Sequence, residues 1–268
     1  MKLSEVYEIA NELAPKALSD EYCAKFGAYD NSGVLVDAGE EVTGVLFSLD
    51  LSLAAIDKAI KTGANVIVTH HPAIYGTISD IRIDDNSLLG KKLVRCLRNG
   101  ISVIAMHLNL DCAKGGTDES LAQGVIIAGG GESTGMQIMH ALSCGGYGRA
   151  YALSGITLGE LAENVKRELH TDRVTVYGAA ERKIYRAASF CGAGVDEAAI
   201  AFARAQGADV IVSSDFKHHL LTLANESGLA VMVLTHYASE NYGFEKYYLE
   251  IRRQIGVPCV YHTDEEML

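Results

Sequence analysis

The sequence predicts an α/β fold in which mixed, largely parallel sheets are covered by helices. Short apolar runs that are typical of buried strands alternate with amphipathic helical patterns along the 268 residues. This order implies crossover connections, which place neighbouring strands parallel to one another. Glycine is frequent and proline rare, 27 residues against 3, which suits tight turns between strands and helices better than disordered linkers.

The first half of the chain contains three strand–helix units that follow an N-terminal helix. Val66–Thr69 is a typical buried strand because its residues are β-branched, and the nearby Pro72 disfavours its continuation. Asp50 or Ser52 can cap the helix that precedes this strand, and Gly63 ends that helix. Residues 20–40 are expected to be irregular. The other expected elements are a helix at 3–14, a strand at 42–49, a polar loop at 75–86, a helix from Ser87 to Gly100, a strand at 101–106 and a helix at 117–125.

After residue 128 the pattern changes. Gly129–Gly131 is expected to form a hinge, and Met136–Ala152 to form a hairpin. Thr157 and Glu160 have the spacing of a capping box, so a helix should begin there. Two further strands are predicted, at 174–177 and 184–191.

An internal similarity links the two halves. Gly63–Thr69 and Gly207–Ser213 match in residue class at six of seven positions, and both lead to a histidine pair, His70-His71 and His218-His219. Any two strand–helix units share some features, so chance similarity is the alternative. We favour two related α/β halves.

Composition excludes several classes of protein. The formal net charge of −11 disfavours a nucleic-acid partner or an anionic membrane surface, which both need a basic face. The six cysteines form no CxxC pair, which argues against a zinc ribbon and a thioredoxin-like site. No apolar run approaches the roughly 18 residues of a membrane span, and the N-terminus lacks the pattern of a secretion signal. We therefore expect a reduced, cytoplasmic protein.

Polar side chains follow four predicted strands at the points where these strands end. Two are the strands at 66–69 and 101–106, the third lies in the 207–213 stretch, and the fourth ends at His236. In open α/β sheets, ligands bind beyond the carboxyl ends of the strands, so these residues are candidates for chemistry. The four groups are His70-His71, His107 to Asp111, Asp215 to His219, and His236 to Glu240.

These groups have the composition of a metal site. His236 and Glu240 lie one turn apart if they begin a helix, so both can contact one ion. Imidazole and carboxylate ligands together suit zinc, manganese or iron better than calcium or magnesium. Two histidines, a carboxylate and a His/Glu pair are more than one catalytic zinc needs, and are appropriate for two metals roughly 3.5–4 Å apart.

The four groups, in this order, resemble the Nif-three-like di-metal family, also called GTP cyclohydrolase I type 2 homologues. The segment Asp30-Asn31-Ser32-Gly33 and the pair Gly148-Arg149 are also similar to motifs of that family. The resemblance covers nearly the whole chain. It implies that two divalent metal ions are held by His70, His71, Asp111, His236 and Glu240.

The resemblance also implies the assembly and the organisation of the chain. Members of the family have two interlinked α/β domains and usually assemble as a toroidal homohexamer. We expect a discontinuous first domain at 1–128 plus 236–268 and a second domain at 129–235.

Three residues are candidates for catalysis, each with a plainer alternative. His107 can be a metal ligand, a packing residue, or a hydrogen-bonding partner that orients Asp111, and we favour the last. Asp215 and His219 can bind an anionic substrate or act as acid and base, or they can belong to a salt-bridged loop, and both readings stay open. The segment Cys191–Gly194 is read as a tight turn rather than a phosphate cradle, because it lacks the full GxGxxG pattern.

Two functions follow as hypotheses. The first is a metal-dependent hydrolase acting on a nucleotide-like or other small molecule, in which the metals activate water and polarise the substrate. The second is a non-catalytic regulatory or scaffold protein that binds metal. The sequence does not identify the substrate.

Overall fold

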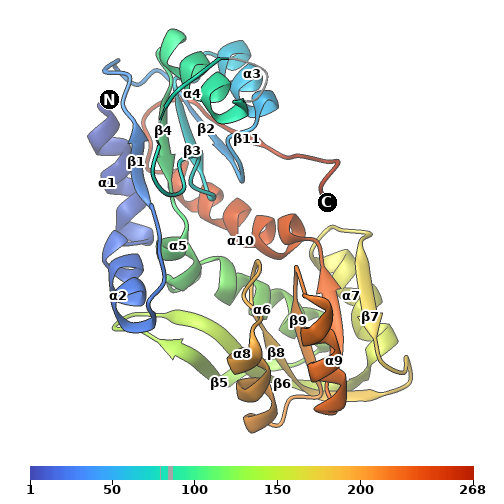
Figure 1. Cartoon of the computed structure of the whole chain (residues 1–268). Coiled ribbons are helices and arrows are strands. Elements are labelled where there is room, and N and C mark those ends of the chain that lie inside the picture. Colours follow the sequence, from blue (N-terminus) through green and yellow to red (C-terminus); the bar gives the residue numbers. More distant parts are fainter. Residues whose placement is uncertain (79, 84–86) are drawn as a thin grey trace. The chain divides into compact units, whose positions relative to one another are not determined.

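The computed structural model describes residues 1–78, 80–83 and 87–268, so residues 79 and 84–86 of the predicted polar loop lie outside the described residues. The chain forms two compact units, each with its own sheet (Figure 1). The first unit consists of Met1–Ala113 and Phe244–Thr263, and the second of Lys114–Gly243 and Asp264–Leu268. Residues 114–128 and 236–243 therefore belong to the second unit.

The first unit contains a five-stranded sheet in the order β1-β4-β3-β2-β11. Its four strands from β4 to β11 are parallel, and β1 is antiparallel to β4 at the edge. The strands are β1 (Gly33–Val36), β2 (Val45–Ser48), β3 (Val66–Thr69), β4 (Ser102–Ala105) and β11 (Cys259–His262). The last of these was not predicted.

Helices pack on this sheet through its alternating side chains. Leu46 and Ile67 belong to a buried apolar cluster with residues of α3 and α4. Phe47 points the opposite way along β2 and packs against Phe244 and Tyr248 of α10. The helices of this unit are α1 (Leu3–Leu13), α2 (Lys16–Phe26), α3 (Leu53–Thr62), α4 (Leu88–Arg98), α5 (Leu108–Cys112) and the second half of α10 (His236–Ile251).

Local signals place α1, α3 and α4 correctly. The side chain of Ser52 accepts a hydrogen bond from Ala55 N at the start of α3, and Gly63 ends that helix with a left-handed φ of 74°. The expectation that residues 20–40 are irregular is wrong in part, because α2 and β1 lie there. Helix α2 buries only two of its residues, and β1 is only four residues long. Neither element therefore shows a clear apolar period in the sequence.

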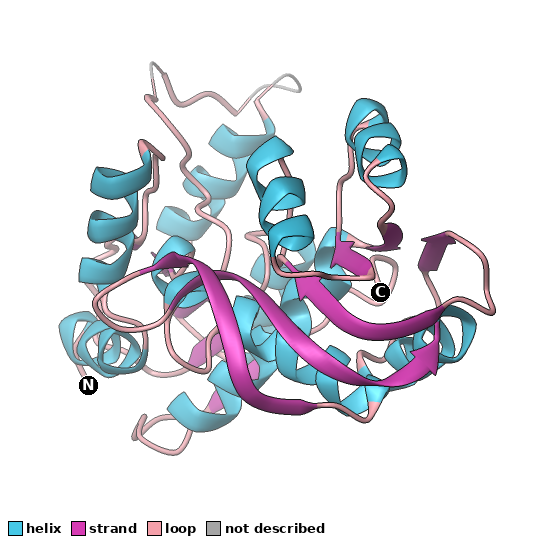
Figure 2. Ribbon diagram, turned by 90° about the horizontal axis from the view of Figure 1, so that it is seen from below, coloured by secondary structure: helices cyan, strands magenta, loops and turns pink. Residues whose placement is uncertain are grey.

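The second unit contains a six-stranded mixed sheet in the order β5-β6-β8-β9-β10-β7. Strands β8, β9 and β10 are parallel, and the other neighbours are antiparallel. Figure 2 shows the strong curvature of the long strands, whose pairing shifts register between β5 and β6. The strands are β5 (Glu132–Ala141), β6 (Gly146–Thr157), β7 (Val174–Tyr177), β8 (Lys183–Ser189), β9 (Val210–Ser213) and β10 (Ala230–Leu234).

Four helices complete this unit, together with the first half of α10. Helices α6 and α7 pack on each other and contact β6, while α8 and α9 pack on each other and contact β9 and β10 respectively. The capping box at Thr157 and Glu160 is present at the start of α7. Their bounds are α6 (Thr117–Gly129), α7 (Leu158–Glu168), α8 (Glu197–Ala205) and α9 (His218–Glu226). The predicted α/β fold, with helices covering mixed and largely parallel sheets, is confirmed.

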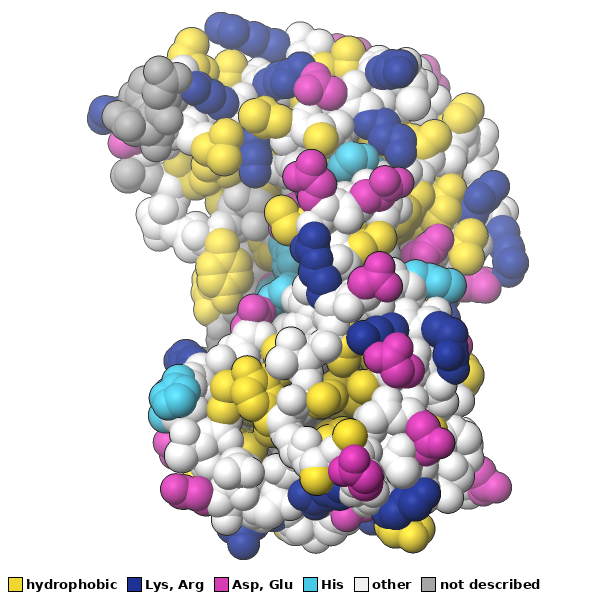
Figure 3. Space-filling model, turned by 90° about the vertical axis from the view of Figure 1, so that its right-hand side faces the viewer, with side chains coloured by type: hydrophobic (Ala, Val, Ile, Leu, Met, Phe, Trp, Pro, Cys, Tyr) yellow, Lys and Arg dark blue, Asp and Glu magenta, His cyan; other side chains and the backbone are white. Residues whose placement is uncertain are grey.

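The surface carries charges of both signs. On the face drawn in Figure 3, lysine and arginine side chains are interspersed with aspartate and glutamate. Among the described residues, no helix is both long and apolar enough to cross a bilayer.

Candidate metal centre

Three histidines gather at one edge of the first unit's sheet. Strands β3 and β4 are parallel with Thr69 opposite Ala105, so His70, His71 and His107 emerge together beyond their carboxyl ends. One ring nitrogen of each lies within 4.8 Å of those of the other two. The ring centroids are 5.0 to 5.8 Å apart.

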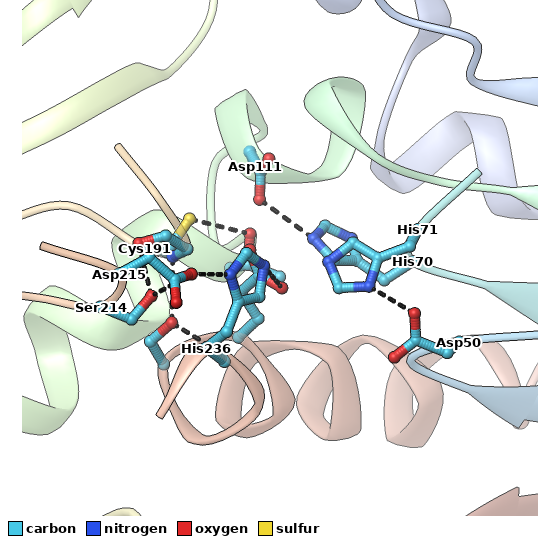
Figure 4. A network of polar contacts seen from close by, with 12 residues as sticks. Asp50, His70, His71, Asp111, Cys191, Ser214, Asp215 and His236 are labelled. Carbon is cyan, nitrogen blue, oxygen red and sulfur yellow. Dashed lines mark hydrogen bonds and ion pairs between the residues drawn. The ribbon is translucent and has the colours of Figure 1, made fainter. Parts of the chain in front are cut away.

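His70 is fully buried and has a fixed orientation. Its Nδ1 donates a hydrogen bond of 2.7 Å to the carbonyl oxygen of Met106. Its Nε2 lies 3.4 Å from Asp111 Oδ1 (Figure 4). In the neutral tautomer that donates from Nδ1, Nε2 carries a lone pair, so two electron-rich atoms face each other. This arrangement is favourable when a proton or a metal cation lies between them.

Carboxylates orient the other two imidazoles of the first unit. His71 Nδ1 lies 2.9 Å from Asp50 Oδ1, and His107 Nδ1 lies 2.8 Å from Asp30 Oδ1. In both rings this contact leaves Nε2 as the nitrogen for a ligand bond, as in metal sites whose histidines donate their other N–H to a carboxylate.

The sequence indicates Asp50 only as a candidate helix cap and does not predict its contact with His71. The register of the sheet is the signal that reveals this contact. Ser48 of β2 pairs with Thr69 of β3. Two residues beyond this pair, Asp50 and His71 leave adjacent strands at the same edge.

Asp30 is the carboxylate partner of His107 Nδ1, and the prediction that His107 orients Asp111 stays a prediction. Burial raises the pKa of Asp30, but hydrogen bonds from His107, Ser19 and Ser32 outweigh it and hold the pKa well below its usual range. The two serine hydroxyls donate to Asp30 Oδ2 at 2.6 and 2.5 Å. Asp30 therefore stays ionised and fixes the ring of His107.

The second unit brings His236, Glu240 and Asp215 together. Strands β9 and β10 are parallel with Ser213 opposite Val233, so the residues that follow both strands meet at one edge. His236 Nδ1 donates to Asp215 Oδ2 (Figure 4), and its Nε2 lies 3.2 Å from Glu240 Oε2, one turn further along α10. Asp215 has a left-handed φ of 51°, a conformation that non-glycine residues adopt mainly where the surrounding structure requires it.

All four histidines thus share one arrangement. An oxygen atom accepts a hydrogen bond from Nδ1, and Nε2 is directed away from that oxygen. The four oxygen atoms belong to Met106, Asp50, Asp30 and Asp215. In each ring the contact at Nδ1 leaves Nε2 as the nitrogen that a metal ion could bind.

Gly192 accommodates the carboxylate of Glu240. Its φ is +57°, and a Cβ at this position would lie 2.3 Å from Glu240 Oε1. Its N–H donates to Ser239 Oγ at 3.0 Å, which ties the turn to α10. The segment Cys191–Gly194 is therefore a tight turn with a contact function, which the sequence analysis missed because its pattern does not reveal the partner.

Asp118 holds this turn in place. Cys191 N donates to its Oδ1 at 3.1 Å, and Gly148 N donates to its Oδ2 at 2.9 Å. Arg149 pairs with the same carboxylate, and both side chains are almost completely buried. The Gly148-Arg149 motif thus helps to hold the turn that contacts Glu240.

His219 is not joined to these groups by any hydrogen bond or ion pair within the described part of the chain. It lies exposed in the first turn of α9. The other predicted residues form two sets: His70, His71, His107 and Asp111 in the first unit, and Asp215, His236 and Glu240 in the second.

A family model and two curated relatives each match most of this chain. The family model described as Duf34/NIF3 (NGG1p interacting factor 3) matches residues 1–264. The GTP cyclohydrolase 1 type 2 homolog of Clostridium acetobutylicum is 30% identical over 242 residues, covering 90% of this chain and 85% of that protein. Its namesake in Methanocaldococcus jannaschii is 30% identical over 249 residues, covering 92% and 93%.

Solved structures have a fold similar to that of this chain. Reduced HcgD from Methanocaldococcus jannaschii aligns with a TM-score of 0.79 and 28% identity, over 97% of each chain. The Staphylococcus aureus hypothetical protein SA1388 aligns with a TM-score of 0.82 over 98% of this chain and 96% of its own. At 24% identity, the latter likeness supports the fold alone.

Proposed function

Because the chain belongs to the Duf34/NIF3 family, we propose that it binds two divalent metal ions and uses them to hydrolyse a small molecule. This membership bears out the resemblance indicated by the strand-end motifs. The observation that carries the proposal is the shared arrangement of His70, His71 and His236, whose Nδ1 atoms are all held by oxygen acceptors.

The proposed ligands are those that the family resemblance implies. They are His70, His71 and Asp111 from the first unit and His236 and Glu240 from the second. Their neutral imidazoles and carboxylates suit zinc, manganese or iron. When bound, such ions polarise a substrate oxygen and lower the pKa of water toward about 7.

The protein's own residues provide orientation and proton transfer. Asp50 and Asp215 hold the rings of His71 and His236. His107, which Asp30 fixes, is proposed to orient Asp111, and the exposed His219 is proposed to act as an acid or base. Replacing His219 by alanine should then lower kcat while the metal content stays unchanged.

The substrate is proposed to be nucleotide-like or another small molecule. The relatives' name makes GTP the first compound to test. We also propose a homohexamer, which the family resemblance implies, located in the cytoplasm. The net charge of −11 disfavours a nucleic-acid or anionic-membrane partner. Sedimentation of the purified chain tests the hexamer directly.

The test is hydrolysis by metal-loaded protein across GTP, phosphoesters and cyclic amides. Wild type should turn over at least one class, and Glu240→Gln should abolish that turnover. Glu245→Gln, an exposed carboxylate on the same helix, is the matched control and should retain it. Bound metal without turnover of any class would contradict the hydrolase and favour the non-catalytic regulatory or scaffold function.

A further inference from the structure

A small cavity adjoins His71 within the first unit. Its volume is ≈ 200 Å³. One side is apolar and includes Leu51, Leu88 and Leu89, and the polar residues that line it include Asp50, His71 and Lys92. The proposed function uses His71 and Asp50, but it leaves the rest of this cavity without a role.

The apolar side is anchored in the fold. Leu51 is 4% exposed and belongs to the apolar cluster beneath α3 and α4, and Leu89 packs against the same cluster. Leu88 is 53% exposed, at the start of α4. The wall therefore has a buried base and an accessible edge, which is a suitable surface for the apolar part of a ligand.

Lys92 supplies a positive charge to the cavity. It lies on α4 and is half-buried. Within the described residues it makes no hydrogen bond and no ion pair, whereas Arg95 on the same helix pairs with Asp57. The carboxylate of Asp50 is hydrogen-bonded to His71. The ammonium group of Lys92 is thus the cation that an entering anion would meet.

We propose that this cavity binds a small organic anion, either a carboxylate or a phosphate ester. Its charge pairs with Lys92, its apolar part lies on the leucine side chains, and its reactive end faces His71. The proposal rests on the proposed function, because His71 is a proposed metal ligand. The cavity is smaller than the roughly 300–1,000 Å³ of sites for drug-sized ligands, so it fits a small metabolite or one part of a larger one.

The experiment measures the Kd of three probes for zinc-loaded protein by NMR titration. Benzoate and phenyl phosphate carry the two kinds of anion, and benzamide is the uncharged analogue. Both anions should bind about fivefold more tightly than benzamide. This ratio of Kd values is the gain that a partly exposed ion pair supplies. Lys92→Gln should remove this preference. Lys91→Gln, the neighbour on α4 that does not line the cavity, should keep it.

A second variant tests the cavity itself. Leu88→Trp places a bulky side chain at the accessible edge, so it should weaken all three probes while Lys92 stays in place. Equal affinity of anions and benzamide in wild type, or an anion preference that survives Lys92→Gln, would overturn the proposal. A preference for one anion over the other identifies the kind of substrate.

Metal content measured on the same samples separates this proposal from the proposed function. Metal-bound protein without a Lys92-dependent preference contradicts the anion site alone. Protein that holds no metal but keeps the preference contradicts the metal proposal alone.

Discussion

Gly192 lies against the carboxylate of Glu240 with no space for a side chain between them. A Cβ on Gly192 would lie 2.3 Å from Glu240 Oε1, closer than non-bonded atoms approach. The contact joins the turn after β8 to the second turn of α10 within the second unit. It connects a proposed metal ligand to a buried network that centres on Asp118.

Gly192→Ala should therefore lower the metal content. The new methyl group must displace the Glu240 carboxylate, and the left-handed backbone adds roughly 1–2 kcal/mol of destabilisation. Thermal unfolding and metal analysis of the variant measure the two effects.

Gly207→Ala is the matched control for Gly192→Ala. Gly207 has a similar φ of +68°, but a Cβ there would meet nothing within 4 Å. The control should lose comparable stability and keep its metal. Equal metal content in the two variants would show that the Gly192 contact does not position Glu240.

Asp118→Asn should destabilise the second unit by about 3 kcal/mol. The substitution removes the charge that compensates Arg149, and a buried cation without its partner is costly. It also weakens the acceptor of Cys191 N and Gly148 N, which anchors the Gly192 turn. Denaturant unfolding measures the loss.

Glu119→Gln tests whether this loss is specific. Glu119 also contacts Arg149, at 3.4 Å, but its side chain is 25% exposed. We expect a loss below about 1 kcal/mol, because partly exposed ion pairs contribute little. Equal losses of stability in the two variants would contradict the claim that Asp118 is the main partner of Arg149.

Asp50→Ala should weaken metal binding by about 10–100-fold while the fold stays intact. Its carboxylate holds Nδ1 of His71, and loss of such a partner leaves the imidazole free to rotate. The side chain is 57% exposed, so little packing is lost. Competition with a chromogenic zinc chelator measures the affinity.

Asp57→Ala is the control for Asp50→Ala. Asp57 is an equally exposed carboxylate of the first unit, at 58%, and pairs with Arg95 on the surface. Its replacement should leave the zinc affinity unchanged. A similar decrease in both variants would mean that general surface charge, rather than the orientation of His71, determines the affinity.

Local patterns in the sequence predict much of the fold. Strand β3 and its histidine pair follow from a β-branched run that ends at two imidazoles, and the helix caps at Ser52 and Thr157 follow from their spacing. These features depend on residues close together in the chain. Strand β11 depends instead on pairing with β2, more than 200 residues earlier, and its four half-buried residues lack a distinctive pattern.

The residues that orient the candidate ligands are harder to predict for the same reason. Asp50 and Asp30 contact histidines 21 and 77 positions away, and Gly192 contacts a glutamate in a later helix. Such contacts depend on strand register and on steric fit in the folded chain. Residue type and spacing alone therefore indicate the ligands but not the groups that hold them.

The metal content of protein purified without chelator tests the central claim most directly. Elemental analysis by mass spectrometry should find two zinc, manganese or iron ions per chain in wild type, and a lower content in both His71→Ala and Glu240→Gln. Protein that contains no stoichiometric metal and takes up none on reconstitution would contradict the account. A metal content that neither substitution changes would contradict it equally.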